Sequence, residues 1–152
     1  MYEPSNLIQE AVRQYGTKRE HLLPILQYVR RKNRFLNEEL LEEISKAMDL
    51  SAADVYGVAS FYSFMDMRPL GHNIIRVCKT ITCYMKGKDD IIKAIEQRLR
   101  IKLGDTTPDG RFSFLEANCI GWCHKGPAML INDRVFTELS PEKAVMAIEE
   151  YM

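Results

Sequence analysis

The hydrophobic residues follow two different spacings along the chain. Up to about residue 68 they recur every three or four positions, which is the spacing of amphipathic helices. The apolar positions of the first three segments are Leu7, Ile8, Ala11, Val12 and Tyr15; Leu22, Leu23, Ile25, Leu26 and Val29; and Leu40, Leu41, Ile44 and Met48. Short helices gain most of their stability from packing against neighbours, so we expect a small helical bundle in residues 1–70.

Helix-capping residues support two of these segments. Asn37 precedes the third segment and Ser51 a fourth, and each side chain can accept a hydrogen bond from a free backbone N–H. The fourth segment runs into residues 55–67, which are rich in aromatic residues and methionine. We interpret most of these side chains as core. A partner-binding surface is the alternative, because both residue types are enriched at interfaces.

After residue 71 the spacing changes to that of a mixed fold. The predicted elements are strands at residues 74–78, 112–117, 128–131 and 134–137, and helices at residues 89–103 and 142–151. Phe112 and Phe114 alternate along the second strand, and the charged Glu116 interrupts this apolar alternation at the next alternate position. The order β-α-β-β-β-α is that of a small thioredoxin-like sandwich. We therefore predict an α/β fold, with this domain in residues 71–152 behind the helical region.

Charge and length exclude several classes of function. The 152 residues carry 21 basic and 21 acidic side chains, so the formal net charge is zero, which argues against a nucleic-acid-binding protein. No apolar stretch approaches the roughly 20 residues that cross a bilayer. The first residues resemble neither a signal peptide nor a transit sequence. We expect a cytoplasmic protein without direct membrane insertion.

Four cysteines carry the candidate chemistry. Cys78 and Cys83 form a C-x4-C pair after the first predicted strand, and Cys119 and Cys123 form a C-x3-C pair after the second. Strands joined by a helical crossover run parallel, so both pairs should lie at the same end of the sheet. In a reducing compartment, paired cysteines are more often metal ligands or catalytic thiols than structural disulfides.

The spacing leaves three kinds of centre open. A [2Fe–2S] cluster takes four cysteine thiolates, and Gly121 and Gly126 could bring backbone N–H groups close to it. A structural zinc site also accepts closely spaced cysteine pairs. Dithiol oxidoreductases normally use C-x-x-C, which neither pair matches. Because four cysteines already fill a [2Fe–2S] centre, His124 is expected outside the ligand set. The chain has no nucleotide-binding or hydrolase motif, so we expect no independent substrate site.

Two segments, VCKTITCYMKG at residues 77–87 and CIGWC at residues 119–123, resemble the thioredoxin-like [2Fe–2S] ferredoxins. More narrowly, they resemble the small [2Fe–2S] subunit of the NADH-oxidising module of complex I. Related proteins include NAD(P)-linked and electron-bifurcating hydrogenases and formate dehydrogenases. The helical segment at residues 54–62 and the turn at residues 106–110 are similar to the family as well.

This resemblance implies a function and a set of ligands. Cys78, Cys83, Cys119 and Cys123 would bind one [2Fe–2S] cluster. The protein would be a one-electron-transfer subunit of an NAD(P)H-linked oxidoreductase, and residues 1–70 would dock onto a flavoprotein subunit that binds FMN and NADH. The same complex would contain a further iron–sulfur subunit. A zinc-stabilised interaction module without a redox role is the alternative function.

Two residues depart from the family pattern. Lys79 follows the first cysteine where many members have glycine, and Trp122 precedes the last cysteine where many have alanine. Both could change solvent access and charge near a bound cluster, and hence its reduction potential.

Overall fold

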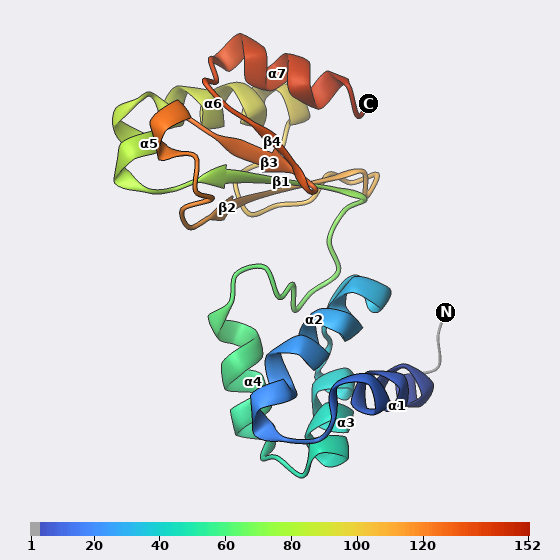
Figure 1. The fold of residues 1–152 in the computed structure, drawn as a ribbon. Helices are drawn as coiled ribbons and strands as arrows, with labels where there is room; N and C mark the ends of the chain where they lie inside the picture. Colours follow the sequence, from blue (N-terminus) through green and yellow to red (C-terminus); the bar gives the residue numbers. More distant parts are fainter. Residues whose placement is uncertain (1–3) are drawn as a thin grey trace. The chain divides into compact units, whose positions relative to one another are not determined.

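A computed structural model describes residues 4–152, with side chains from Asn6 onward, and the chain divides into two compact units after Pro69 (Figure 1). The first unit contains α1 (Pro4–Tyr15), the 3-10 turn η1 (Arg19–His21), α2 (Leu22–Asn33), α3 (Glu38–Met48) and α4 (Ala52–Phe61). The second contains β1 (Asn73–Cys78), α5 (Ile81–Met85), α6 (Lys88–Leu99), β2 (Phe112–Ala117), the 3-10 turn η2 (Cys123–Lys125), β3 (Met129–Ile131), β4 (Arg134–Phe136) and α7 (Pro141–Glu149).

The first unit is the predicted helical bundle. The Asn37 side chain accepts a hydrogen bond from the backbone N–H of Leu40 at 3.1 Å, and Ser51 accepts one from Asp54 at 3.1 Å, so both predicted caps are confirmed. The apolar stripes of α1, α2 and α3 meet in one buried core, which Val55 and Ala59 of α4 complete.

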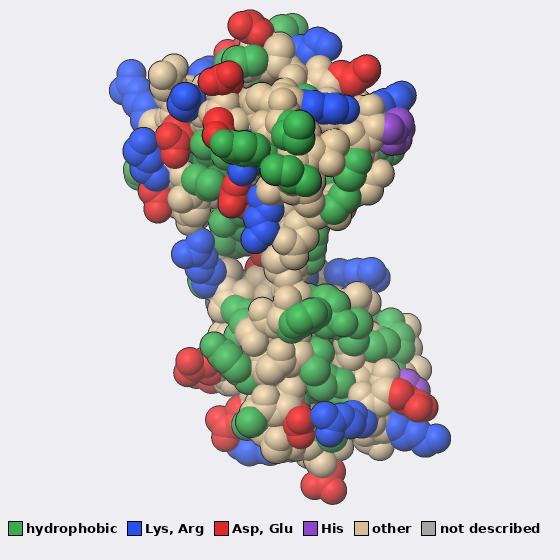
Figure 2. All heavy atoms as spheres, turned by 90° about the vertical axis from the view of Figure 1, so that its left-hand side faces the viewer, with side chains coloured by type: hydrophobic (Ala, Val, Ile, Leu, Met, Phe, Trp, Pro, Cys, Tyr) green, Lys and Arg blue, Asp and Glu red, His purple; other side chains and the backbone are tan. Residues whose placement is uncertain are grey.

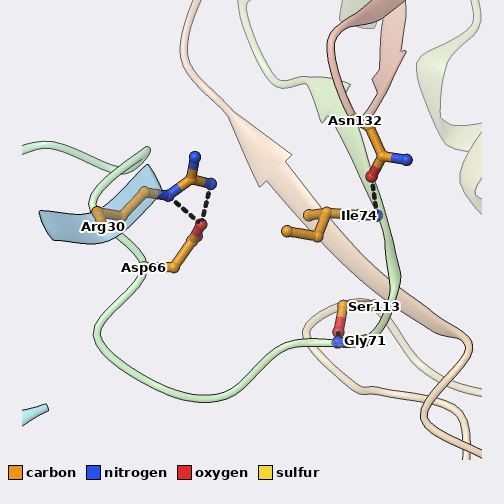
Figure 3. Close-up of polar contacts among 6 residues, drawn as sticks. All are labelled: Arg30, Asp66, Gly71, Ile74, Ser113 and Asn132. Carbon is orange, nitrogen blue, oxygen red and sulfur yellow. Dashed lines mark hydrogen bonds and ion pairs between the residues drawn. The ribbon is translucent and has the colours of Figure 1, made fainter. Parts of the chain in front are cut away.

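An ion pair fixes the segment that follows α4. Asp66 is almost fully buried and accepts two hydrogen bonds from the guanidinium of Arg30 on α2 (Figure 3). The backbone carbonyl of Asp66 also accepts from the N–H of Leu36 at 2.7 Å. Removing one partner of such a pair would leave a buried charge uncompensated, so this contact holds the end of the helical unit in place.

The aromatic residues of α4 and the following turn are exposed, and their assignment to the core was wrong. Val55, Ala59 and Met65 are buried, but the exposed fractions of Tyr56, Phe61, Tyr62 and Phe64 range from 42% to 79%. Figure 2 shows hydrophobic side chains gathered over this part of the helical unit. Apolar residues that recur every three or four positions predict a helix, but they do not show whether other parts of the protein cover a second apolar face of that helix. The helix turns only its Val55 and Ala59 side toward the bundle.

The second unit is built on a four-stranded sheet in the order β2-β1-β3-β4. Strands β1 and β2 are parallel, with Cys78 opposite Ala117, and β3 and β4 are antiparallel neighbours joined by a turn at Asn132-Asp133. Helices α6 and α7 cover one face of the sheet (Figure 1). The core between them is built mainly from alternate strand residues, including Ile75, Val77, Phe112, Phe114, Met129 and Ile131.

Two side chains hold the sheet's entry segment. The Ser113 hydroxyl accepts a hydrogen bond from the N–H of Gly71 at 2.7 Å, and the Asn132 side chain accepts one from the N–H of Ile74 at 2.9 Å (Figure 3). A Cβ on Gly71 would lie 2.7 Å from the backbone of Phe112. A glycine is therefore needed where this segment passes the start of β2.

The end of α6 and the short helix α5 differ from the prediction. Helix α6 ends at Leu99 and not at residue 103, because Arg100 takes a left-handed conformation and the Glu96 carboxylate accepts the N–H of Leu103 at 3.1 Å. The prediction contained no helix at Cys83, where α5 spans Ile81–Met85; five residues are too few to produce a recognisable period. The Ser140 hydroxyl caps α7 by accepting the N–H of Lys143.

Within residues 4–152, none of the helices combines the length and apolar character that a membrane span requires.

Candidate metal centre

Cys78 lies at the end of β1, between the chain that leaves β2 and the chain that leads into β3. The N–H of Cys78 donates to the carbonyl of Ala128 at 3.1 Å, and the next N–H, from Lys79, donates to the carbonyl of Ala117 at 2.9 Å. The loop that carries Cys119 and Cys123 leaves β2 after Ala117 and returns at Ala128. Both ends of this loop are thereby fixed beside Cys78.

Cys78 and Cys83 form a buried pair of free thiols. Cys83 comes from α5, which folds back beside the end of β1. Burial opposes ionisation of Cys78, but hydrogen bonds from the hydroxyl and backbone of Thr80 and from the backbone of Ile120 outweigh it, so its pKa is lowered. The Thr80 hydroxyl lies 3.1 Å from the Cys78 sulfur. Burial and the neighbouring Cys78 raise the pKa of Cys83.

Cys119 and Cys123 form a more exposed pair. Their sulfur atoms are 3.2 Å apart, well beyond the roughly 2.05 Å of a disulfide, and both thiols are free. The backbone N–H of Gly121 points at the Cys119 sulfur from 3.4 Å. Interaction with Cys119, burial, and the charges of Cys78 and Cys83 raise the pKa of Cys123. All four thiols thus lie at one end of the sheet, as the parallel crossover predicts.

Gly126 brings the backbone close to the buried pair. A Cβ at this position would lie 3.1 Å from the sulfur of Cys83, which is tighter than ordinary van der Waals contact. Its backbone angles are ordinary for any residue, so the requirement for glycine here is space and not conformation. The backbone of Gly126 therefore lies directly against this thiol.

The four thiols are arranged as two separate pairs at one end of the sheet, and this donor set fits a two-iron cluster. A structural zinc site needs four ligands around one ion. A [2Fe–2S] cluster instead takes four thiolates distributed over two irons, which suits two separate pairs. Backbone N–H groups near the sulfurs also suit its negative charge.

The other predicted site residues lie around the thiols. His124 stacks against Trp122, with ring centroids 5.7 Å apart. Trp122 is about one-third exposed and Lys79 is exposed. Sequence reasoning missed the hydroxyl of Thr80 and the contact made by Lys86. Lys86 in fact donates from Nζ to the Cys123 carbonyl at 3.2 Å.

Known proteins resemble this chain over most of its length. It is 35% identical over 149 residues to an NADH-quinone oxidoreductase subunit from Buchnera aphidicola, an alignment that covers 98% of this chain and 92% of the relative. It is 34% identical over 144 residues to the subunit of the same name from Escherichia coli K12, covering 95% of this chain and 87% of the relative.

A solved structure shares the fold. Part of an NAD+-reducing [NiFe]-hydrogenase superposes on 86% of this chain with a TM-score of 0.73 and 26% identity, and the match takes up 22% of that hydrogenase chain. The family model of the thioredoxin-like [2Fe–2S] ferredoxins matches residues 8–152, which include both helical and sheet units and all four cysteines. This chain belongs to the thioredoxin-like [2Fe–2S] ferredoxin family.

Proposed function

We propose that this protein is the one-electron-transfer subunit of a multisubunit NAD(P)H-linked oxidoreductase, with one [2Fe–2S] cluster held by Cys78, Cys83, Cys119 and Cys123. The observation that carries the proposal is the meeting of four free thiols, as two pairs, at one end of the sheet. Such a cluster accepts and returns one electron at a time, so the subunit needs a separate electron source and sink.

The residues around the thiols give the two pairs different surroundings. Cys78 and Cys83 are shielded from water, and the Thr80 hydroxyl lies within hydrogen-bond distance of the Cys78 sulfur, 3.1 Å away. Cys119 is exposed, so its side of the site is open to a partner. An electron would therefore enter or leave on the Cys119 side, while the buried pair anchors the centre in the fold.

The partner in this proposal is a flavoprotein subunit that binds FMN and NAD(P)H, with a further iron–sulfur subunit in the same complex. We assign docking to the helical unit. Its exposed aromatic side chains, Tyr56, Phe61, Tyr62 and Phe64, support that assignment, since large exposed apolar groups mark interaction surfaces. The chain itself carries no substrate site in this account.

Metal analysis of protein purified without oxygen tests the proposal. We expect iron and acid-labile sulfide in near-equal amounts. Zinc bound stoichiometrically without sulfide would indicate the zinc-stabilised interaction module instead. Disulfide reduction that survives iron chelation would indicate a dithiol oxidoreductase.

A further inference from the structure

The segment that joins α5 to α6 reaches across to the loop of the second cysteine pair at two points. Lys86, directly after α5, donates from Nζ to the carbonyl of Cys123 at 3.2 Å. Lys88, the first residue of α6, donates from Nζ to the Glu116 carboxylate at 2.9 Å. Glu116 lies three residues before Cys119. One lysine therefore contacts the strand just before this pair, and the other contacts the second cysteine of the pair.

The ion pair between Lys88 and Glu116 is partly buried. The side chain of Lys88 is 11% exposed and that of Glu116 is 29% exposed. Glu116 follows Phe112 and Phe114 at alternate positions of β2, on the face that packs against the helices. A carboxylate there must be paired, because a shielded charge without a partner is costly. Lys88 supplies the partner.

Lys86 and Lys88 are two positions apart but contact different residues, and the backbone between them explains why. Gly87 between them has a φ of +96°, a conformation that favours glycine and reverses the chain between α5 and α6. Lys86 therefore leaves the end of α5 toward Cys123, whereas Lys88 enters α6. The ammonium of Lys88 also lies 5.9 Å from the ring centroid of Tyr84, next to Cys83 in sequence.

We propose that Lys86 and Lys88 are positioning residues that hold the Cys119–Cys123 loop in register with the Cys78–Cys83 pair. The two pairs come from different parts of the chain, and no disulfide joins them. Through these bonds, the segment that carries Cys83 fixes both the approach to Cys119 and the backbone of Cys123. The inference rests on the proposed function, because the register matters only if the four thiols share one cluster.

The test measures how fast a ferrous chelator removes iron from the complete, cluster-loaded chain. Lys86→Met and Lys88→Met keep much of each side chain's length and remove its charged donor. We expect each variant to release iron at least about tenfold faster than wild type, the factor expected when a charge-assisted hydrogen bond is lost. Lys88→Arg, which can still pair with Glu116, should release iron close to the wild-type rate.

Three further variants separate positioning from charge and from general destabilisation. Lys125→Met removes a charge beside Cys123 without removing either of the two bonds, and should release iron at the wild-type rate. Glu116→Met removes the acceptor and should act like Lys88→Met. The double variant Lys88→Met/Glu116→Met should be no faster than the faster single variant, because both changes break one pair. Circular dichroism should show folded protein throughout. If Lys88→Met does not fold, the iron-release rate of Lys86→Met still tests the inference, because Lys86 is exposed.

Two results would overturn the inference while the proposed function stands: release rates within twofold of wild type for both lysine variants, or equal acceleration by Lys125→Met. The electron paramagnetic resonance spectrum of the reduced cluster gives a second reading, since displaced thiolates should broaden or shift it. Wild-type protein that contains neither iron nor sulfide would overturn the proposed function first, and this inference with it.

Discussion

Gly126 lies against Cys83 so closely that a Cβ would stand 3.1 Å from the thiol sulfur. Gly126→Ala should therefore crowd the position of this ligand without straining the backbone. We expect a clear loss of bound iron and sulfide, measured on protein purified without oxygen. Gly57→Ala is the matched control, because nothing lies within 4 Å of its Cβ. Equal cluster content in the two variants would show that the space beside Cys83 is not needed.

Serine substitution should separate the cluster from the fold. The packed core of the sheet unit is formed by residues such as Phe114, Ile131 and Ile148, away from the exposed Cys119. We expect Cys119→Ser and Cys83→Ser to abolish normal cluster assembly while the far-ultraviolet circular dichroism of cluster-free protein stays close to that of wild type. Loss of the helical signal in both variants would show instead that the fold depends on the cluster.

The hydroxyl of Thr80 should influence the reduction potential. It lies 3.1 Å from the Cys78 sulfur, and hydrogen bonds to ligand sulfurs stabilise the more negative, reduced form of a cluster. Thr80→Val removes the hydroxyl and keeps the shape, so the midpoint potential should become more negative in a redox titration followed by electron paramagnetic resonance. Thr82→Val, in the same helix, should leave the potential near its wild-type value. An unchanged potential in Thr80→Val would contradict the role given to this hydroxyl.

Docking of the helical unit should depend on the exposed aromatic side chains. Phe61 is 79% exposed, so Phe61→Asp should alter stability little but weaken binding to the flavoprotein subunit about 30-fold or more if Phe61 is a central contact. Met146→Asp replaces a similarly exposed apolar residue of α7 and should leave binding unchanged. Pull-down with the flavoprotein subunit provides the measurement. Equally strong capture of a chain that lacks residues 1–69 would contradict docking through this unit.

Glu96 gives a prediction about pH. Its carboxylate accepts the N–H of Leu103 and a hydrogen bond from Lys102, and these contacts lower its pKa. A lowered pKa in the folded state means that the ionised form stabilises the fold above the ordinary glutamate value, and that this stabilisation is lost as pH falls through the folded-state pKa. The stabilities of wild type and Glu96→Gln, measured by urea unfolding, should therefore differ at pH 7, and the difference should shrink as the pH falls below the ordinary glutamate pKa. A stability difference between the two proteins that grows as the pH falls would contradict this prediction.

The sequence predicted the features that depend on neighbouring residues. Asn37 and Ser51 cap helices because a capping side chain bonds to a backbone N–H a few residues away. The parallel arrangement of β1 and β2 follows from the helical crossover between them. That arrangement in turn placed the two cysteine pairs at one end of the sheet, so the candidate site could be outlined from spacing.

Features that depend on distant contacts could not be predicted in the same way. The exposed face of α4 shows the same hydrophobic spacing as a buried one, and only the packed bundle reveals that nothing there covers Phe61. The contacts of Lys86 with Cys123 and of Lys88 with Glu116 join residues more than 25 positions apart. Glu116 did leave a signal, because it breaks the alternation of its strand, but the sequence does not identify its partner.

The central claim is that four cysteines hold one cluster that carries one electron. Reductive titration of the anaerobically purified protein, with spins counted by electron paramagnetic resonance, tests it most directly. We predict that one electron per chain reduces the centre and yields a signal that integrates to one unpaired spin per cluster, and that this signal is lost in Cys119→Ser. Uptake of two electrons per chain without a paramagnetic signal, or no uptake at all in protein that contains stoichiometric zinc, would contradict it.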